Sequence, residues 1–389
     1  MPYKTFGFTE EQILMRDSIL GLLGRALPAE KMLEFDKTST FPEEAFQAVA
    51  ADGWLGLPIA EAYGGAGACN MDMAVFIEAM GYYHYGVRSA YMTTSIYGAS
   101  HLQYHASEAQ RQEMLPRLIK GQLKMCIAYS EPDSGSDAAG MIVRARRDGD
   151  DYVLNGEKTS ISFSTQADEI MLFARTGSEE EKARGVSTFY APLDAAGITR
   201  TAFNDMGTTA VGRGSLFFDD VRIPASCLLG EEGAGFRQVM HGFDFSRALI
   251  GLQVLGAARA SLDEAWQYST EREAFGNPIA AYQGVTQPLA ECETLYEAAR
   301  LLCFKTLFMR DEDITHTKEA AMVKWWAPKV AFDIIHQCLL THGHYGYTKD
   351  LPLEQRMRDV LGLQIGDGTA QIQKMIIARE IVGRIAVPY

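Results

Sequence analysis

The chain has 389 residues, enough for two or three domains or for one large intertwined unit. Its content of 47% hydrophobic and 22% charged residues is typical of a soluble globular protein. The 36 basic and 50 acidic residues leave a net charge of −14, which argues against non-specific binding to nucleic acid or to anionic membranes. A polyanionic ligand would therefore need a local basic pocket.

The cysteines and the N-terminus indicate the cellular setting. Six cysteines lie far apart without CxxC pairs, so we expect reduced thiols and no disulfide or zinc framework. The N-terminal stretch lacks an apolar signal core and an Arg- and Ser-rich transit segment. No run of about 18 or more apolar residues is present, so no membrane span is expected. These features predict a soluble, cytoplasmic protein.

The N-terminal region is predicted to be helical over residues 8–120. The Thr-Glu-Glu-Gln sequence at Thr9 is typical of a capping box, and Pro42 stands in the first turn of another helix. Ser107 is a plausible N-cap for a further helix. We expect a first domain over residues 1–120.

The middle region, residues 121–232, changes to the pattern of strands. Residues 139–156 read as a hairpin with a polar, glycine-containing turn. Further apolar strand-like runs follow at 170–175, 186–191 and 215–221. We expect a small antiparallel sheet domain here.

The remaining region, residues 233–389, returns to helical periodicity. Long periodic segments joined by Gly and Pro cover residues 235–271, 282–311, 315–343 and 367–386. These segments predict a set of four helices.

The stretch from Leu363 to Arg379 carries one carboxylate, Asp367, in a glycine-flanked turn before a helical segment. Such a turn can push an acid into a cleft, and the glycines leave room for a ligand to approach the backbone. An aspartate at a helix start is also a favoured N-cap, which would bond backbone amides instead of a ligand. Thr369 could cap the helix in its place and free Asp367.

Two segments of the middle region combine hydroxyl groups with turns. The segment Tyr129–Asp137 can hydrogen-bond a polar planar ligand, although its composition alone favours an ordinary Pro/Gly turn. The segment Asn155–Phe163 follows as a hairpin turn and strand.

Three polar segments of the last region also have ordinary explanations. Arg247 lies on a long helix, where an arginine usually makes a surface ion pair. Arg272 before Gly276 can bind a diphosphate through its guanidinium, or the segment can cap a helix. His342 and His344 have no third partner at metal-ligand spacing, so we expect no metal site.

Taken in their order along the chain, these segments resemble the motifs of the acyl-CoA dehydrogenase family. Residues 130–137 are similar to the family's TEPxxGSD, residues 155–163 to NGxKxWITN, and residues 272–283 to RxxFGxxIxxxQ. The Asp367 turn resembles the segment with the family's catalytic base, which is usually Glu. The likeness spans essentially the full chain. It implies an α+β, mostly α fold with an N-terminal helical domain, a middle antiparallel β domain and a C-terminal four-helix bundle.

The resemblance implies FAD-dependent α,β-dehydrogenation of an acyl-CoA thioester. Asp367 would take the α-proton, its backbone amide would help to hold the thioester oxygen, and the β-hydrogen would leave as hydride to flavin N5. Some members place the base one residue before the helix arginine, but Ser246 stands there, so we favour Asp367. The resemblance assigns FAD contacts to Ser130, Ser136, Ser162, Arg272, Phe275, Gln283, Thr369 and Gln371, and substrate contacts to Ser136, Asp244, Arg247 and Gly368.

Several positions besides the base depart from the family pattern, and Ser130 and Ser162 each stand where the family has Thr. Ser160 replaces a Trp that normally packs beside the flavin, and Phe163, in place of Asn, could fill that space. Leu340 and His344 replace Gln and Gly in the family's QxxGGxGY, which predicts a repacked adenine or diphosphate pocket.

An Asp base, which is shorter than Glu, affects which acyl groups the site can accept. The Asp carboxylate retreats from the position of a Glu carboxylate by about 1.5 Å, one carbon–carbon bond. Asp at this position resembles enzymes for alicyclic acyl groups, such as the cyclohexanecarboxyl-CoA dehydrogenases, so we expect a compact or ring-bearing substrate. Tyr91 and Tyr97 could shorten the acyl tunnel, or they could be plain core residues.

The resemblance also implies partners and leaves rivals open. It implies electron-transfer flavoprotein as the acceptor and a homo-oligomer, usually a tetramer, in which Arg272 and Phe275 reach the FAD of a neighbouring subunit. The rival functions are dehydrogenation of a short- or branched-chain acyl-CoA or of an acyl group on a carrier protein, and redox-silent binding of CoA.

Overall fold

The computed structural model describes residues 7–387; the first six residues of the N-terminal stretch, where no signal core is seen, lie outside them. The chain begins with helices. Thr9 and Ser107 form reciprocal capping boxes with Gln12 and Gln110, which confirms both predicted helix starts. The helices of this part are α1 (Glu10–Ala26), α2 (Ala29–Thr38), α3 (Glu43–Ala51), α4 (Asn70–Gly81), α5 (Tyr85–Tyr91), α6 (Ala99–His105) and α7 (Glu108–Ile119).

Helices α5 and α6 are joined by a seven-residue π-helix, η3 (Met92–Gly98). Every residue of η3 is buried. A π-helix widens the turn and shifts the direction of the side chains that follow, and such turns are frequent at functional sites.

The middle of the chain forms a seven-stranded sheet with the order β1-β4-β2-β3-β7-β6, and β5 pairs with β4. The hairpin predicted at residues 139–156 is present as β2 and β3. Most pairings are antiparallel as expected, but β4 runs parallel to both of its neighbours β1 and β2, between which it lies in the sheet. The strands are β1 (Met125–Ala128), β2 (Arg144–Asp148), β3 (Asp151–Ile161), β4 (Glu169–Arg175), β5 (Val186–Pro192), β6 (Ile198–Ala202) and β7 (Gly214–Pro224).

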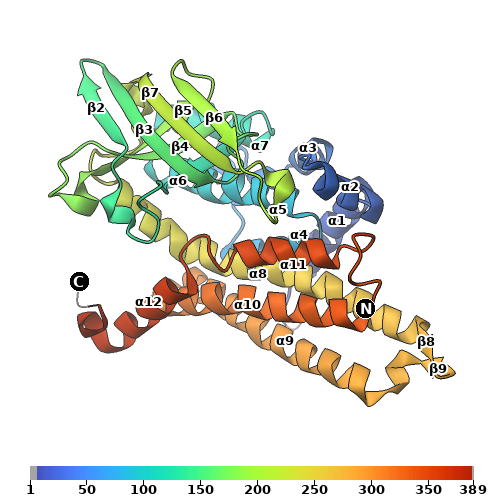
Figure 1. The fold of residues 1–389 in the computed structure, drawn as a ribbon. Helices are drawn as coiled ribbons and strands as arrows, with labels where there is room; N and C mark the ends of the chain where they lie inside the picture. The colour runs from blue at the N-terminus through green and yellow to red at the C-terminus, as the bar shows by residue number, and fades with distance from the viewer. Residues whose placement is uncertain (1–6, 388–389) are drawn as a thin grey trace.

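The last part is helical, and Figure 1 shows it as a layer beneath the sheet. A short hairpin, β8 (Glu273–Ala274) and β9 (Asn277–Pro278), forms the tip between its two longest helices. Its helices are α8 (Gly235–Glu271), α9 (Gln283–Asp311), α10 (Thr317–Thr341), α11 (Leu353–Gly362) and α12 (Ala370–Val382). Single-turn helices complete the chain at η1 (Trp54–Gly56), η2 (Glu61–Tyr63), η4 (Ala138–Gly140), η5 (Lys182–Gly185), η6 (Thr209–Val211), η7 (Ala225–Cys227), η8 (Ile279–Ala281) and η9 (Gly383–Ala386).

Helix α8 is the centre of the core and packs against α4, α9 and α10. At its contact with α4, Gly81 and Gly256 allow a close approach, since a Cβ on Gly256 would lie 2.6 Å from the Gly81 backbone. A Cβ on Gly81 would lie 2.5 Å from the Gln253 carbonyl oxygen, so only glycine fits there. The N-terminal and C-terminal helices thus share one core.

Helix α11, which the sequence analysis did not predict, ties three parts of the chain together. Arg358 donates to Asp36 of α2 and to the carbonyl of Met206, both at 2.7 Å. The neighbouring Asp359 accepts a hydrogen bond from the Thr208 amide at 2.6 Å. The N-terminal helices, the sheet region and the C-terminal helices therefore meet at α11.

Among residues 7–387, no helix combines the length and the apolar character needed to span a membrane.

Candidate active site

The turn between α11 and α12 presents Asp367 without using it as a helix cap. Thr369 is the N-cap of α12, since its side chain accepts a hydrogen bond from the Ile372 amide at 3.4 Å. The backbone at Asp367 is left-handed, with φ of 54°, and Gly368 follows with φ of 93°. The alternative reading of Asp367 as the N-cap is therefore wrong, and its carboxylate is free for another role.

Two buried side chains hold this turn from below. The Lys324 ammonium, on α10, donates to the carbonyls of Leu363 at 2.7 Å and Gly368 at 3.4 Å. The Gln373 amide nitrogen donates to the carbonyls of Asp367 and Gly368, both at 3.3 Å. Burial lowers the pKa of Lys324 to about 8, although the nearby negative charge of Asp367 opposes this decrease. Lys324 and Gln373 were missed from the sequence; a lysine inside the otherwise apolar run of α10 was the available signal.

The carboxylate of Asp367 is half-buried beside polar groups from two other helices. The Tyr97 hydroxyl donates to Asp367 Oδ2 at 3.0 Å. Arg247 of α8 interacts electrostatically with Asp367 and donates to Asp244 Oδ1 at 3.0 Å. Burial lowers the pKa of Arg247, and the carboxylates of Asp244 and Asp367 oppose that decrease. The structure thus brings together five predicted site residues: Asp367, Gly368, Tyr97, Arg247 and Asp244.

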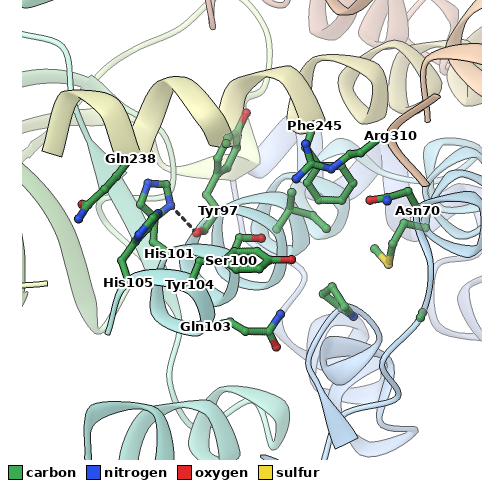
Figure 2. A pocket seen from close by; sticks show the side chains of 15 residues that line it. Asn70, Tyr97, Ser100, His101, Gln103, Tyr104, His105, Gln238, Phe245 and Arg310 are labelled. Atoms are coloured by element: carbon green, nitrogen blue, oxygen red, sulfur yellow. Dashed lines mark hydrogen bonds between the residues drawn. The ribbon is translucent and has the colours of Figure 1, made fainter. Parts of the chain in front are cut away.

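A cavity of about 120 Å³ lies beside Tyr97, between η3, α6 and α8. Figure 2 shows Phe245 and Arg310 at one side of it and His101 and His105 at the other. Tyr97 is one of the residues that line the cavity, and its hydroxyl points away from the other labelled residues of the lining. Tyr97 therefore connects the cavity wall with the acid.

Tyr91, the other tyrosine predicted for the pocket, is a core residue. Its side chain is fully buried against Phe76, and its hydroxyl donates to the Trp54 carbonyl at 3.1 Å. It is not among the residues that line the cavity. The prediction of a pocket role for Tyr91 is therefore corrected to the plain core alternative.

The hydroxyl-rich segments of the middle region meet at the end of β3. The Thr159 amide donates to the Ser130 carbonyl at 2.9 Å, which joins the segment after β1 to the end of β3. The side-chain hydroxyls of Ser130, Ser160 and Ser162 make no hydrogen bond within residues 7–387 and are at least partly accessible. Ser136 is exposed on the same connection. These groups can bind a polar ligand at this edge of the sheet.

A buried ion pair supports that edge. Lys158 donates to Glu131 Oε1 at 2.7 Å and to the Tyr129 carbonyl at 3.0 Å. Glu131 also accepts hydrogen bonds from the amides of Ile142 and Val143. Burial lowers the pKa of Lys158 to about 8, and Glu131 opposes this decrease. Both residues lie within the motif segments, but no local sequence pattern predicts that they pair.

Phe163 does not occupy the place expected for it. It is fully buried and packs against Phe41 and Phe46, with ring centroids 5.1 and 6.4 Å away. Ser160 is exposed at φ of 59°. The expectation that Phe163 fills the space of the missing Trp is therefore wrong, because the side chain turns into the core between the sheet and α3.

Three predicted ligand residues lie elsewhere in the molecule. Arg272, Phe275 and Gln283 are exposed around the β8–β9 tip, at the far end of α8 from the sheet (Figure 1). Phe275 is 94% exposed, and it forms the hairpin turn with Gly276, both at positive φ. Gly276 thus belongs to a hairpin turn and is not a helix C-cap. The structure does not bring these residues to Asp367 within one chain.

The two histidines considered as a metal pair are separated by their surroundings. His342 is buried, with Nδ1 donating to the Cys338 carbonyl at 2.8 Å, and stacks on Tyr268, whereas His344 is exposed. Over the described range 7–387, no group of three or more His, Cys, Asp or Glu residues could hold a metal ion. Leu340 is 55% exposed and Gln371 is exposed, beside the capping Thr369.

Comparison with known proteins identifies the family. Models of the acyl-CoA dehydrogenase N-terminal, middle and C-terminal domains match residues 9–122, 126–221 and 233–382. The chain is 32% identical to a probable acyl-CoA dehydrogenase, YngJ, of Bacillus subtilis, covering 97% of this chain and 99% of that protein. It is 34% identical to a 3-(aryl)acrylate reductase of Clostridium sporogenes, covering 90% and 93%.

Among solved structures, the butyryl-CoA dehydrogenase of Megasphaera elsdenii is similar over 97% of this chain and 100% of that one, with a TM-score of 0.93 and 29% identity. The fold predicted from the sequence is thereby confirmed. The chain belongs to the acyl-CoA dehydrogenase family of FAD-dependent oxidoreductases.

Proposed function

We propose that this protein catalyses the FAD-dependent α,β-dehydrogenation of an acyl-CoA thioester with a compact acyl group, and that Asp367 is the base. The observation that carries the proposal is the Asp367 carboxylate. It is released from capping by Thr369, held by Tyr97 and accompanied by the cation of Arg247. A carboxylate positioned in this way can abstract a weakly acidic α-proton.

The same turn can stabilise the charge that develops when the α-proton leaves. The backbone amide of Asp367 makes no backbone hydrogen bond within residues 7–387, so it is available to donate to the thioester oxygen. Hydrogen-bond donors that are already oriented toward a developing oxyanion lower the barrier most effectively. Asp367 would thus supply both the base and one oxyanion donor.

The residues at the end of β3 fit a bound FAD. The hydroxyls of Ser130 and Ser162 are available as partners for the polar edge of the isoalloxazine, and the buried Lys158–Glu131 pair keeps their segments in place. When bound, FAD would supply the acceptor for the hydride that leaves the β-carbon. Overall, one α C–H bond and one β C–H bond break, a C=C bond forms, and the α-proton stays on Asp367.

A compact acyl group follows from the length of the base and from Tyr97. The Asp side chain presents its carboxylate about 1.5 Å short of where Glu would present it. The α-carbon must therefore come closer, as a ring-bearing α-branched group such as cyclohexanecarboxyl does. Tyr97, whose hydroxyl donates a hydrogen bond to Asp367 and which lines the neighbouring cavity, limits the space for a long chain.

Two assembly partners belong to the proposal. Electron-transfer flavoprotein as acceptor is supported by the 32% identity to the CarC subunit of a caffeyl-CoA reductase–Etf complex of Acetobacterium woodii. A homo-oligomer, with four subunits as our expectation, is supported by the exposed Arg272 and Phe275 at the β8–β9 tip, far from the Asp367 turn of their own chain.

An anaerobic titration of the purified flavoprotein with cyclohexanecarboxyl-CoA, with butyryl-CoA in parallel, tests the proposal. The visible flavin band should bleach with the ring substrate, and the Asp367→Asn variant should keep its flavin but fail to bleach. Bleaching by the straight chain alone would retain the dehydrogenase and discard the alicyclic substrate. A flavin that no acyl-CoA bleaches would overturn the proposed function.

A further inference from the structure

Tyr97 makes the one hydrogen bond that a side chain in residues 7–387 donates to the Asp367 carboxylate. The hydroxyl lies 3.0 Å from Oδ2, although the two residues are 270 positions apart in the chain. Tyr97 is 7% exposed, and burial raises the pKa of its hydroxyl well above the usual value. The group is therefore a protonated, stationary donor and not a second acid with a variable charge.

The local backbone fixes the direction of this side chain. Tyr97 is the sixth residue of the π-helix η3, whose widened turn sets the orientation of the residues at its end. The Tyr97 carbonyl accepts a hydrogen bond from His101 Nδ1 at 3.0 Å, within the first turn of α6. The Ser246 side chain of α8 also interacts with the Tyr97 hydroxyl. Three segments thus aim the hydroxyl at Asp367.

The two cations near Asp367 do not hold its carboxylate in this way. Lys324 donates to the carbonyls of Leu363 and Gly368, and so it fixes the backbone of the turn. Arg247 donates to Asp244, whose second oxygen accepts a hydrogen bond from the Thr317 hydroxyl at 2.5 Å. These residues leave the rotation of the Asp367 side chain itself to Tyr97.

We propose that Tyr97 is a positioning residue that holds Asp367 Oδ2, so that Oδ1 faces the α-carbon of the substrate. The proposal rests on the function proposed above. A short base has no spare reach, and a hydrogen bond to an ionised acceptor is both strong and directional. Tyr97 therefore fixes the direction of a base that has no extra reach with which to correct a poor angle.

Proton abstraction can be measured separately from flavin reduction. The α-hydrogens of 3,3-dimethylbutyryl-CoA can exchange with D₂O, but its β-carbon carries no hydrogen that could leave as hydride. Mass spectrometry of the recovered thioester therefore reports the base alone. We expect Tyr97→Phe to slow this exchange by about ten- to a hundredfold and to lower kcat by the same factor with a substrate that the enzyme can dehydrogenate. This is the scale expected for a hydrogen bond to a charged group or for a misplaced base. KM should change less than about threefold, since the substrate contacts are retained.

The matched control is Tyr296→Phe, which also removes a buried tyrosine hydroxyl that donates to a carboxylate, in this case Glu78 at 2.8 Å. It should leave the exchange rate unchanged.

Each outcome has one meaning. An active wild type whose Tyr97→Phe variant exchanges within about twofold of it overturns the inference alone. A wild type that neither exchanges nor dehydrogenates any acyl-CoA overturns the proposed function and this inference with it.

Discussion

Asp367 combines a short side chain with an unusual backbone. A non-glycine residue at φ of 54° is held there at a cost of about 1–3 kcal/mol, which the surroundings must offset. Aspartate tolerates this conformation better than most residues. Hydrogen bonds from Lys324 and Gln373 to the turn supply the compensation. The backbone conformation and the acid therefore belong together.

Lengthening the base should separate the two substrate classes. In Asp367→Glu the carboxylate advances by about 1.5 Å past its present position and its present contact with Tyr97. We expect turnover of the ring substrate to fall by about a hundredfold, as for a misplacement of this size. Steady-state rates with cyclohexanecarboxyl-CoA and butyryl-CoA provide the measurement. Undiminished ring turnover together with faster straight-chain turnover would sink the argument from side-chain length.

At the scale of single residues, the sequence predicted the local features of the site and missed the distant ones. The capping role of Thr369 and the free carboxylate of Asp367 were readable because they depend on a few neighbours. The Tyr97–Asp367 bond joins residues 270 positions apart, so no local pattern contains it. The error at Phe163 has the same origin, since its neighbours Phe41 and Phe46 come from α3 and the segment before it.

At the scale of elements, the connection from α11 to α12 determines where the acid lies. Gly368 has φ of 93°, and a Cβ on it would collide with Gln373 Nε2. Gln373 would then have to release the carbonyls of Asp367 and Gly368. The turn thus depends on a glycine at this position.

Gly368→Ala should therefore lower the free energy of unfolding by about 1–2 kcal/mol through the left-handed backbone alone. It should also lower kcat, because the turn moves Asp367. Gly362→Ala is the control: an added Cβ meets no atom within 4 Å, and the residue ends α11 without a positive φ. Urea unfolding and steady-state kinetics of both variants provide the test, and equal effects at the two glycines would contradict it.

Elements that depend on interactions between near neighbours in the sequence were predictable, and elements that depend on distant contacts were not. The capping box at Thr9, the N-cap at Ser107 and the β2–β3 hairpin are local, and the sequence predicted them. Helix α11 is only ten residues long and its apolar face is interrupted by charges, so it was missed. The π-helix η3 and the parallel pairing of β1 with β4 depend on packing that no short periodic pattern encodes.

At the scale of the whole molecule, α11 makes stability depend on pH. Asp359 is buried where the three parts of the chain meet, and burial raises its pKa from 3.8 to about 7, despite the amide of Thr208 and the cations of Arg88 and Arg358. The folded state therefore binds more protons than the unfolded state between these pH values. The contribution of Asp359 to stability is complete below about pH 3.8 and is lost as pH rises through 7.

The Asp359→Asn variant should remove this dependence, since an amide oxygen can still accept the hydrogen bond from Thr208. Relative to wild type, its free energy of unfolding should rise between pH 4 and 7 by up to about 1 kcal/mol per pH unit. Urea unfolding at several pH values up to 8 provides the measurement. The range stops there because Lys158 and Lys324, each with a pKa lowered to about 8, add stability of the opposite slope at higher pH. Parallel curves for the two proteins would refute the assignment.

Helix α8 runs unbroken from Gly235 to Glu271 and carries Arg247 near one end, with Arg272 just beyond the other. A rise of about 1.5 Å per residue over about 25 residues separates the two by nearly 40 Å. A site that combines Asp367 with Arg272 must therefore take them from different chains. Asp367→Asn and Arg272→Ala chains, each inactive alone, should complement each other when dissociated and reassembled together. If two chains pair at random to build each site, about one quarter of the sites would carry both intact residues. Recovery of about one quarter of the wild-type activity would therefore indicate that two subunits build one catalytic centre.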